Sequence, residues 1–283
     1  MTKIAIITDS DASLPDWVAQ KFNIDIVSIL INFGEESYTA CVDIDDAELF
    51  RLIDKYNKLP TTAAPSPNDF YLAFQKAFEA GADEIVCICV SSQISATYQA
   101  ALNAAEMYEG KRIAVIDSLN LSMGQGLMVI AAAEALAQNA NVDDIIKLID
   151  EMRSKIHVFA ALPTLKYLAM GGRMGKLAAG VADTLNIKPV LTARDGKLEL
   201  LEKVRTFKKA EERLIELAEE CSLGKEIERF AMIHVNNEAG AQALAKKLQG
   251  KLNINLEPII AEFTPGLSVH AGSGVVGFGL LTN

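Results

Sequence analysis

The sequence is poor in the residues that several classes of protein require. Aromatic residues make up only 6% of its 283 residues, and acidic residues outnumber basic ones, which gives a formal net charge of −10. A protein that binds nucleic acid irrespective of sequence, or an anionic membrane surface, needs a positive face. The charge therefore argues against nucleic acid and membrane surfaces as partners. The apolar residues, 50% of the chain, are mostly aliphatic and suit a large core or a tunnel for an alkyl chain equally well.

Long apolar runs are also missing. No run reaches the roughly 20 residues of a membrane-spanning helix, and the longest candidate, residues 127–136, contains Glu134. The first three residues lead directly into a predicted strand, with no secretion signal before it. We therefore expect no transmembrane segment and a cytoplasmic protein.

Cysteine and histidine are too sparse, and too scattered, to indicate a metal site. Cys87 and Cys89 alternate with apolar residues in a predicted strand, as small core residues do. Their spacing, Cys-x-Cys, has no second pair and no nearby histidine, which zinc sites require. We expect neither a metal nor a cofactor.

The sequence does contain a regular alternation of strand-like and helix-like segments. Strands are predicted at residues 4–8, 25–32, 84–90, 113–117, 156–161, 188–193, 197–204, 229–235 and 258–263. Helices are predicted at residues 14–21, 45–56, 67–80, 95–108, 123–138, 142–155, 176–185, 208–220 and 239–248. The alternation in the first half predicts an α/β fold with a mostly parallel sheet. The second half is less regular and contains a hairpin signal at Asp195-Gly196. We therefore predict two domains, residues 1–155 with a parallel sheet and residues 156–283 as a smaller mixed α/β domain.

Five runs of small polar residues suggest where a ligand binds. They are Thr8-Asp9-Ser10, Thr61-Thr62, Ser91-Ser92 with Ser95 and Thr97, Asp117-Ser118 with Ser122, and His270-Ala271-Gly272-Ser273-Gly274. Three of them follow predicted strands, and open parallel sheets bind ligands outside the carboxyl ends of their strands. Hydroxyls and free backbone N–H groups there suit a ligand with an anionic or strongly polar end. Each run taken alone is also explained as a helix cap.

Two glycine-rich segments resemble nucleotide-binding motifs and fail on context. Residues 272–277 match the dinucleotide pattern, but no βαβ unit and no acidic residue follow them. Residues 171–176 have the wrong glycine spacing for a phosphate loop, and Leu177 stands where a Ser or Thr must hold Mg²⁺. We therefore expect no phosphotransfer by this chain itself.

A serine hydrolase is the alternative that the residues leave open. His270 lies among small residues where a ligand can approach, and Ser92 or Ser95 is the candidate nucleophile. The Gly-x-Ser-x-Gly elbow of α/β hydrolases is missing. A third interpretation is a sensor of lipid supply that binds another protein.

Taken together, the motifs and their order resemble the DegV family over essentially the whole chain. The matching segments are Ile7-Thr8-Asp9-Ser10 with Leu14-Pro15, Thr62 with Pro65-Ser66-Pro67, Ser91-Ser92 with Ser95 and Thr97-Tyr98-Gln99, Asp117-Ser118 with Met123-Gly124-Gln125-Gly126, Gly171-Gly172-Arg173 with Gly175-Lys176, Asn186-Ile187-Lys188-Pro189-Val190-Leu191, Lys203-Val204-Arg205-Thr206, and His270 with Gly272 and Gly274. Five residues depart from the family pattern: Ala63, Ala64, Ile94, Ala96 and Ser273.

The resemblance implies a two-domain DegV-like fold with one long-chain fatty acid buried in a tunnel between the domains. It implies that Thr62, Ser95 and His270 bind the carboxylate, with Ser92 behind them. Family members include the subunit that presents a bound fatty acid to a separate ATP-dependent fatty acid kinase, which makes the acyl phosphate. Arg173 and Arg205 match family arginines associated with docking to that kinase and with transfer. We thus expect a lipid-binding carrier without turnover of its own, and a monomer.

Overall fold

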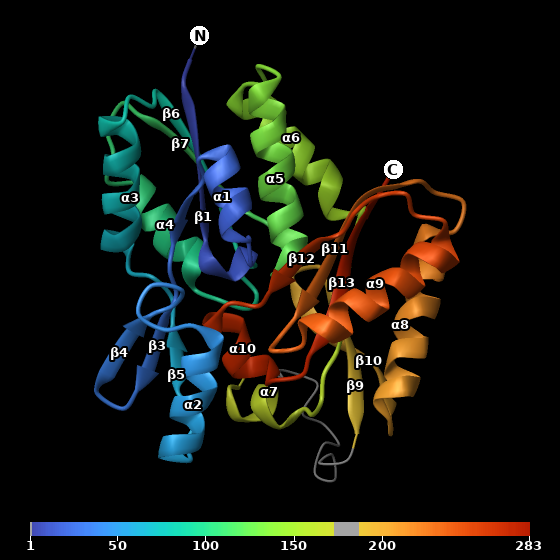
Figure 1. Cartoon of the computed structure of the whole chain (residues 1–283). Coiled ribbons are helices and arrows are strands. Elements are labelled where there is room, and N and C mark those ends of the chain that lie inside the picture. The colour runs from blue at the N-terminus through green and yellow to red at the C-terminus, as the bar shows by residue number, and fades with distance from the viewer. Residues whose placement is uncertain (1, 173–186) are drawn as a thin grey trace.

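The computed structural model describes residues 2–172 and 187–283 and has an α/β fold (Figure 1). The helix predicted at residues 176–185 and the candidate Arg173 lie outside these residues. Within them, no helix combines the length and the apolar character that crossing a membrane requires. In the same ranges, no three His, Cys, Asp or Glu side chains gather in a group that could hold a metal ion.

The first sheet is parallel and has the strand order β2-β1-β6-β7. Its strands are β1 (Ile4–Asp9), β2 (Asp25–Val27), β6 (Glu84–Cys89) and β7 (Arg112–Asp117). The polar runs that end or follow β1, β6 and β7 therefore meet at one edge of the sheet, as the sequence predicted. The prediction of a single strand over residues 25–32 is wrong. The chain leaves this sheet after Val27, and the Ile29 N–H is donated to Ser10 Oγ at 3.0 Å.

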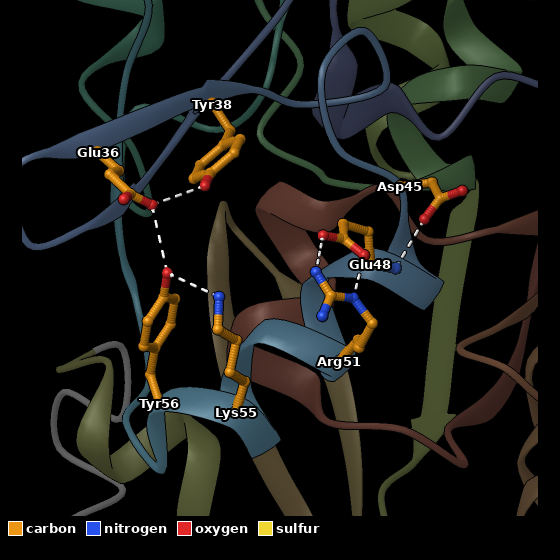
Figure 2. A network of polar contacts seen from close by, with 7 residues as sticks. All are labelled: Glu36, Tyr38, Asp45, Glu48, Arg51, Lys55 and Tyr56. Atoms are coloured by element: carbon orange, nitrogen blue, oxygen red, sulfur yellow. Dashed lines mark hydrogen bonds and ion pairs between the residues drawn. The ribbon is translucent and has the colours of Figure 1, made fainter.

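A small antiparallel sheet follows that break, and the sequence analysis missed it. Its order is β4-β3-β5, formed by β3 (Leu30–Phe33), β4 (Glu36–Thr39) and β5 (Thr61–Ala63). Helix α2 (Asp46–Tyr56) packs beside it. Figure 2 shows the polar contacts on this outer side, where the hydroxyls of Tyr38 and Tyr56 are donated to Glu36 at 2.8 and 3.5 Å. These contacts are exposed, so apolar packing rather than charge pairing holds α2 in place.

The largest sheet has six strands in the order β10-β9-β8-β13-β11-β12. They are β8 (Ile156–Ala161), β9 (Lys188–Arg194), β10 (Lys197–Val204), β11 (Ile227–His234), β12 (Ile259–Glu262) and β13 (Val276–Thr282). β9 and β10 form the hairpin predicted around Asp195-Gly196. The sequence analysis missed β13, since glycine is unfavourable inside strands. A Cβ at Gly277 would lie 2.3 Å from the Phe159 carbonyl oxygen, so only glycine lets β13 approach β8 this closely.

The helices and sheets form layers (Figure 1). Helices α3 (Pro67–Glu79) and α4 (Thr97–Ala105) cover one face of the parallel sheet, and α8 (Phe207–Ser222) and α9 (Glu238–Leu252) cover the outer face of the six-stranded sheet. Between the sheets lies α5 (Met123–Ala137), which contacts strands of both, with α1 (Asp16–Phe22) and α6 (Val142–Arg153) beside it. The short segments η1 (Ser10–Ala12), α7 (Lys166–Met170) and α10 (Pro265–Ala271) lie near the ends of the sheets.

Helix α5 is the centre of the largest apolar cluster. Its first eleven residues are all buried, as in a helix that is apolar on every side. The cluster joins Ile88 of the first sheet to Ile233 of the second. Apolar packing is thus continuous across residue 156, where the sequence predicts a domain boundary, and that boundary remains a prediction.

One polar side chain of α5 is buried in this core. The Gln125 side-chain amide is donated to Thr8 Oγ1 at 3.0 Å, Asp9 Oδ2 at 3.1 Å and the Ile88 carbonyl oxygen at 3.2 Å. Asp9 also accepts the Val90 N–H at 2.7 Å. Burial raises the pKa of Asp9 to about 6, against the lowering effect of these hydrogen bonds. The network fixes α5 against β1 and β6.

We expect Gln125→Leu to lower the free energy of unfolding by about 1–3 kcal/mol, because the buried Asp9 carboxyl loses a hydrogen-bond donor. Urea denaturation measures the change. The matched control is Gln138→Leu, at an exposed glutamine that follows the same helix. Equal stability of the two variants would contradict a structural role for the Gln125 network.

Candidate functional site

An apolar cavity lies between the start of α5 and the inner face of the six-stranded sheet. Its empty space, with the open solvent at its mouth included, is about 620 Å³. Most of its wall is aliphatic, with side chains that include Ile94, Val158, Leu191, Ile233 and Leu267. Among the described lining residues, those with a polar side chain are Ser122, Thr192 and His270.

Thr62 and His270 form a polar contact beside this cavity. Thr62 Oγ1 lies 3.1 Å from His270 Nε2, although the two residues are far apart in the sequence. Thr62 comes from β5 and His270 from the last turn of α10. The structure therefore brings together two of the residues that the sequence analysis proposed for binding a carboxylate.

Helix α10 is held in place by hydrogen bonds to segments from the first part of the chain. Thr264, which precedes the helix, donates its hydroxyl to the Ser10 carbonyl oxygen at 3.1 Å. Ser268 donates its hydroxyl to Asp46 Oδ2 at 2.6 Å, which joins α10 to α2. Because His270 is on the same short helix, these contacts set its position. The sequence analysis assigned no role to Asp46 or Ser268, and no local pattern pairs them.

The Asp46 carboxyl group is buried, with 5% of the residue exposed. Burial raises its pKa to about 7, and the negative charges of Glu262 and Asp45 raise it further, while the hydrogen bond from Ser268 opposes the shift. The carboxyl group therefore titrates close to neutral pH in the folded protein.

The C-terminal end of α7 lies directly against the imidazole. A Cβ built on Gly171 would lie 2.2 Å from His270 Nδ1, and one on Gly272 would lie 2.5 Å from the Tyr167 ring. Both distances are shorter than any real Cβ contact, so glycine is needed at both positions for α7 and α10 to meet. Gly272 also has a φ of +82°, which favours glycine.

Ser92 and Ser95, which were also predicted to bind the carboxylate, make hydrogen bonds to residues other than Thr62 and His270. Ser95 Oγ lies 2.8 Å from Thr97 Oγ1, and the Thr97 N–H is donated back to Ser95 Oγ at 3.3 Å. Ser92 is exposed, and its N–H is donated to Asp117 Oδ1 at 3.2 Å. Ile94, between them in the sequence, lines the cavity. The loop after β6 therefore borders the cavity, but the contacts of Ser92 and Ser95 are made within the parallel-sheet edge.

The neighbouring Ser91 joins this loop to the second sheet. Its side chain is fully buried and donates a hydrogen bond to the Gly196 carbonyl oxygen at 2.7 Å, at the tip of the β9–β10 hairpin. Ser91 thus helps to hold the hairpin over the cavity. This role could not be predicted from the sequence.

The other two of the three histidines are His157 and His234, and the remaining site candidate is Arg205. Burial lowers the pKa of His157 and of His234, so both favour the neutral form. Arg205 is exposed and lies just after β10, before α8. Its guanidinium is therefore open to a partner, whereas Arg173 lies outside the described residues.

Comparison with known proteins gives the family. The family model described as "Uncharacterised protein, DegV family" matches residues 3–283. A DegV domain-containing protein of Halalkalibacterium halodurans is 35% identical over 278 residues, which cover 98% of each chain. The chain belongs to the DegV family. The resemblance inferred from the sequence motifs is thereby confirmed.

Solved structures of DegV-family proteins share this fold. A structure from Thermus thermophilus, described as fatty acid binding of a DegV family protein, matches with a TM-score of 0.93 and 28% identity over 100% of both chains. A fatty acid (stearic acid)-binding protein from Eubacterium ventriosum matches with a TM-score of 0.90 and 25% identity, over 100% of this chain and 98% of the other. The predicted DegV-like α/β fold is therefore confirmed.

We expect Gly171→Ala to displace the imidazole of His270, because the new methyl group and Nδ1 cannot occupy the same space. The imidazole resonances of His270 in NMR spectra measure the change. Gly250→Ala is the matched control, since a Cβ at that exposed position of α9 meets nothing within 4 Å. Unchanged His270 resonances in Gly171→Ala would contradict the close approach of α7.

We expect Asp46→Asn to alter how stability depends on pH. The folded protein binds a proton at Asp46 up to about pH 7, whereas an ordinary aspartate has a pKa of 3.8. The free energy of unfolding contributed by this group therefore falls as pH rises from about 4 to 7, by up to about 1.4 kcal/mol per pH unit.

Urea denaturation between pH 4 and 8 tests this expectation. Asp46→Asn should lack that slope, so that its stability relative to wild type improves as pH rises. Asp54→Asn, at an exposed residue of the same helix, controls for the loss of one negative charge. Parallel stability curves for wild type and Asp46→Asn would show that Asp46 is not protonated near neutral pH.

Proposed function

We propose that this protein binds a long-chain fatty acid, with the alkyl chain in the apolar cavity and the carboxylate at Thr62 and His270. The observation that carries the proposal is the contact between Thr62 Oγ1 and His270 Nε2 beside an otherwise apolar wall. Two of the solved structures with this fold are described as fatty-acid-binding proteins. Fatty acids combine the apolar and polar parts that such a site recognises.

The chemistry of the wall suits such a ligand. Each methylene that leaves water for an apolar site contributes about 0.8 kcal/mol, so a dozen of them contribute roughly 10 kcal/mol before the cost of ordering the chain. A carboxylate that enters the protein must be hydrogen-bonded or neutralised. The Thr62 hydroxyl and the His270 imidazole supply such donors without a permanent charge.

The proposal extends to the fate of the ligand. A separate ATP-dependent kinase would phosphorylate the presented carboxylate, and this protein would act as a carrier rather than an enzyme, monomeric and cytoplasmic. Phosphoryl transfer needs positive charge around the phosphates, and Arg205, which is exposed, would contribute it at the contact with the kinase. Ser95, with Ser92 behind it, would complete the carboxylate site. Arg173 belongs to the proposed docking surface on its sequence motif alone.

Mass spectrometry of an organic extract of the purified recombinant protein tests the ligand. We expect a fatty acid at a molar ratio near one. We expect Thr62→Val to weaken binding of added fatty acid about tenfold or more, since a carboxylate loses a hydrogen bond, and His270→Ala to do the same. Thr61→Val, at the exposed neighbour, is the matched control.

Two results would contradict the proposal. A protein that carries no fatty acid and takes up none when it is added is not a carrier. Wild-type affinity in both Thr62→Val and His270→Ala would refute the carboxylate site but not the binding of the alkyl chain in the cavity. Turnover of an acyl ester that is lost in Ser95→Ala would instead favour the hydrolase alternative, with His270 as base.

A further inference from the structure

Ser122 is a polar residue in the wall of the apolar cavity. It lies between β7 and α5 and is fully buried. Its side-chain oxygen has no hydrogen-bond partner among the described residues, yet the residue lines the cavity. A buried hydroxyl without a partner has lost its hydrogen bonds to water and gained none. Such groups are rare in native proteins and call for an explanation.

The backbone at this residue makes the presence of a side chain more unusual. Ser122 has φ 48° and ψ −141°, in a region that favours glycine, and its side chain makes no capping hydrogen bond to α5. The conformation is imposed by two backbone contacts: the Ser122 N–H is donated to the Asp11 carbonyl oxygen at 2.7 Å, and its carbonyl oxygen accepts the Gly126 N–H at 2.8 Å. Glycine would adopt this conformation without strain and would leave no hydroxyl unpaired.

The other polar side chains of the wall already have partners. The Thr192 hydroxyl is donated to the Val158 carbonyl oxygen at 2.8 Å, and His270 contacts Thr62. Among the described lining residues, Ser122 is therefore the one whose hydroxyl can hydrogen-bond to a ligand in the cavity without giving up another partner. A plain alkyl chain offers it no partner, whereas an oxygen atom on that chain does.

We propose that the cavity binds fatty acids with an oxygen substituent, a hydroxyl or keto group, on the alkyl chain, and that the Ser122 hydroxyl hydrogen-bonds to this oxygen. The inference rests on the proposed function, in which the carboxylate lies at Thr62 and His270. Sites that hydrogen-bond a polar group of the ligand discriminate against the analogue without it, because the protein group is then left unpaired. Ser122 is thus a residue that determines specificity within the cavity.

Competition binding to delipidated protein tests this inference. The probes are hexadecanoic acid and a positional series of its monohydroxylated derivatives. We expect at least one derivative to bind wild type about 2- to 10-fold more tightly than the parent acid, the range for one net hydrogen bond. This preference should disappear in both Ser122→Ala and Ser122→Gly. The glycine variant relieves the backbone strain, so it separates loss of the hydroxyl from misfolding.

Ser118→Ala is the control for loss of a buried hydroxyl in the same loop. Ser118 is buried, but its hydroxyl is donated to the Asn120 carbonyl oxygen at 3.1 Å, so its variant should keep the preference. The inference is overturned if wild type prefers no derivative over the parent acid, or if the preference survives in both Ser122 variants. In either case, binding of the parent acid leaves the proposed function standing. If neither parent nor derivative binds, the proposed function is wrong, and this inference is wrong with it.

Discussion

The burial of α5 between two sheets is the constraint on which the rest of the structure depends. A helix whose first three turns have no polar face must be covered on every side, and here a parallel sheet covers one side and a mixed sheet the other. The hydrogen bonds from Gln125 to Thr8, Asp9 and the Ile88 carbonyl fix the helix against the first sheet. The two sheets are thereby held apart at a set distance, and the cavity opens where α5 begins.

The candidate site is assembled from short segments that the rest of the fold positions. Helix α10 is too short to be stable alone, and it is held by Ser10 and by the buried pair of Asp46 and Ser268. Glycine at position 171 lets α7 come up against the histidine of α10. The polar end of the cavity thus depends on contacts between parts of the chain that are more than 200 residues apart, such as Thr62 and His270.

Most regular elements of the first half could be predicted from the sequence, because strand and helix periods are local. The capping box at Ser66 and Asp69 is an example, and both of its hydrogen bonds are present. Several elements that were missed have weak local signals: β4 and β5 are only four and three residues long, β13 contains glycines that only its contact with β8 explains, and α10 is a single short helix. The single strand predicted across residues 25–32 is two strands in different sheets. The prediction failed because the pattern of apolar residues does not show where a chain passes from one sheet to another.

The sequence by itself determined the family, the α/β class and the meeting of three polar runs at the carboxyl edge of the parallel sheet, because these follow from residue order and from the period of apolar residues. The sequence motifs also indicated Thr62 and His270 as candidate residues for binding a carboxylate. Only the tertiary structure decided that these two touch, that Ser95 bonds to Thr97, and that Asp46 lies beneath α10 with a pKa near 7. Contacts and pKa values depend on what surrounds a side chain in space. Burial between elements that are distant in sequence cannot be recognised from either segment alone.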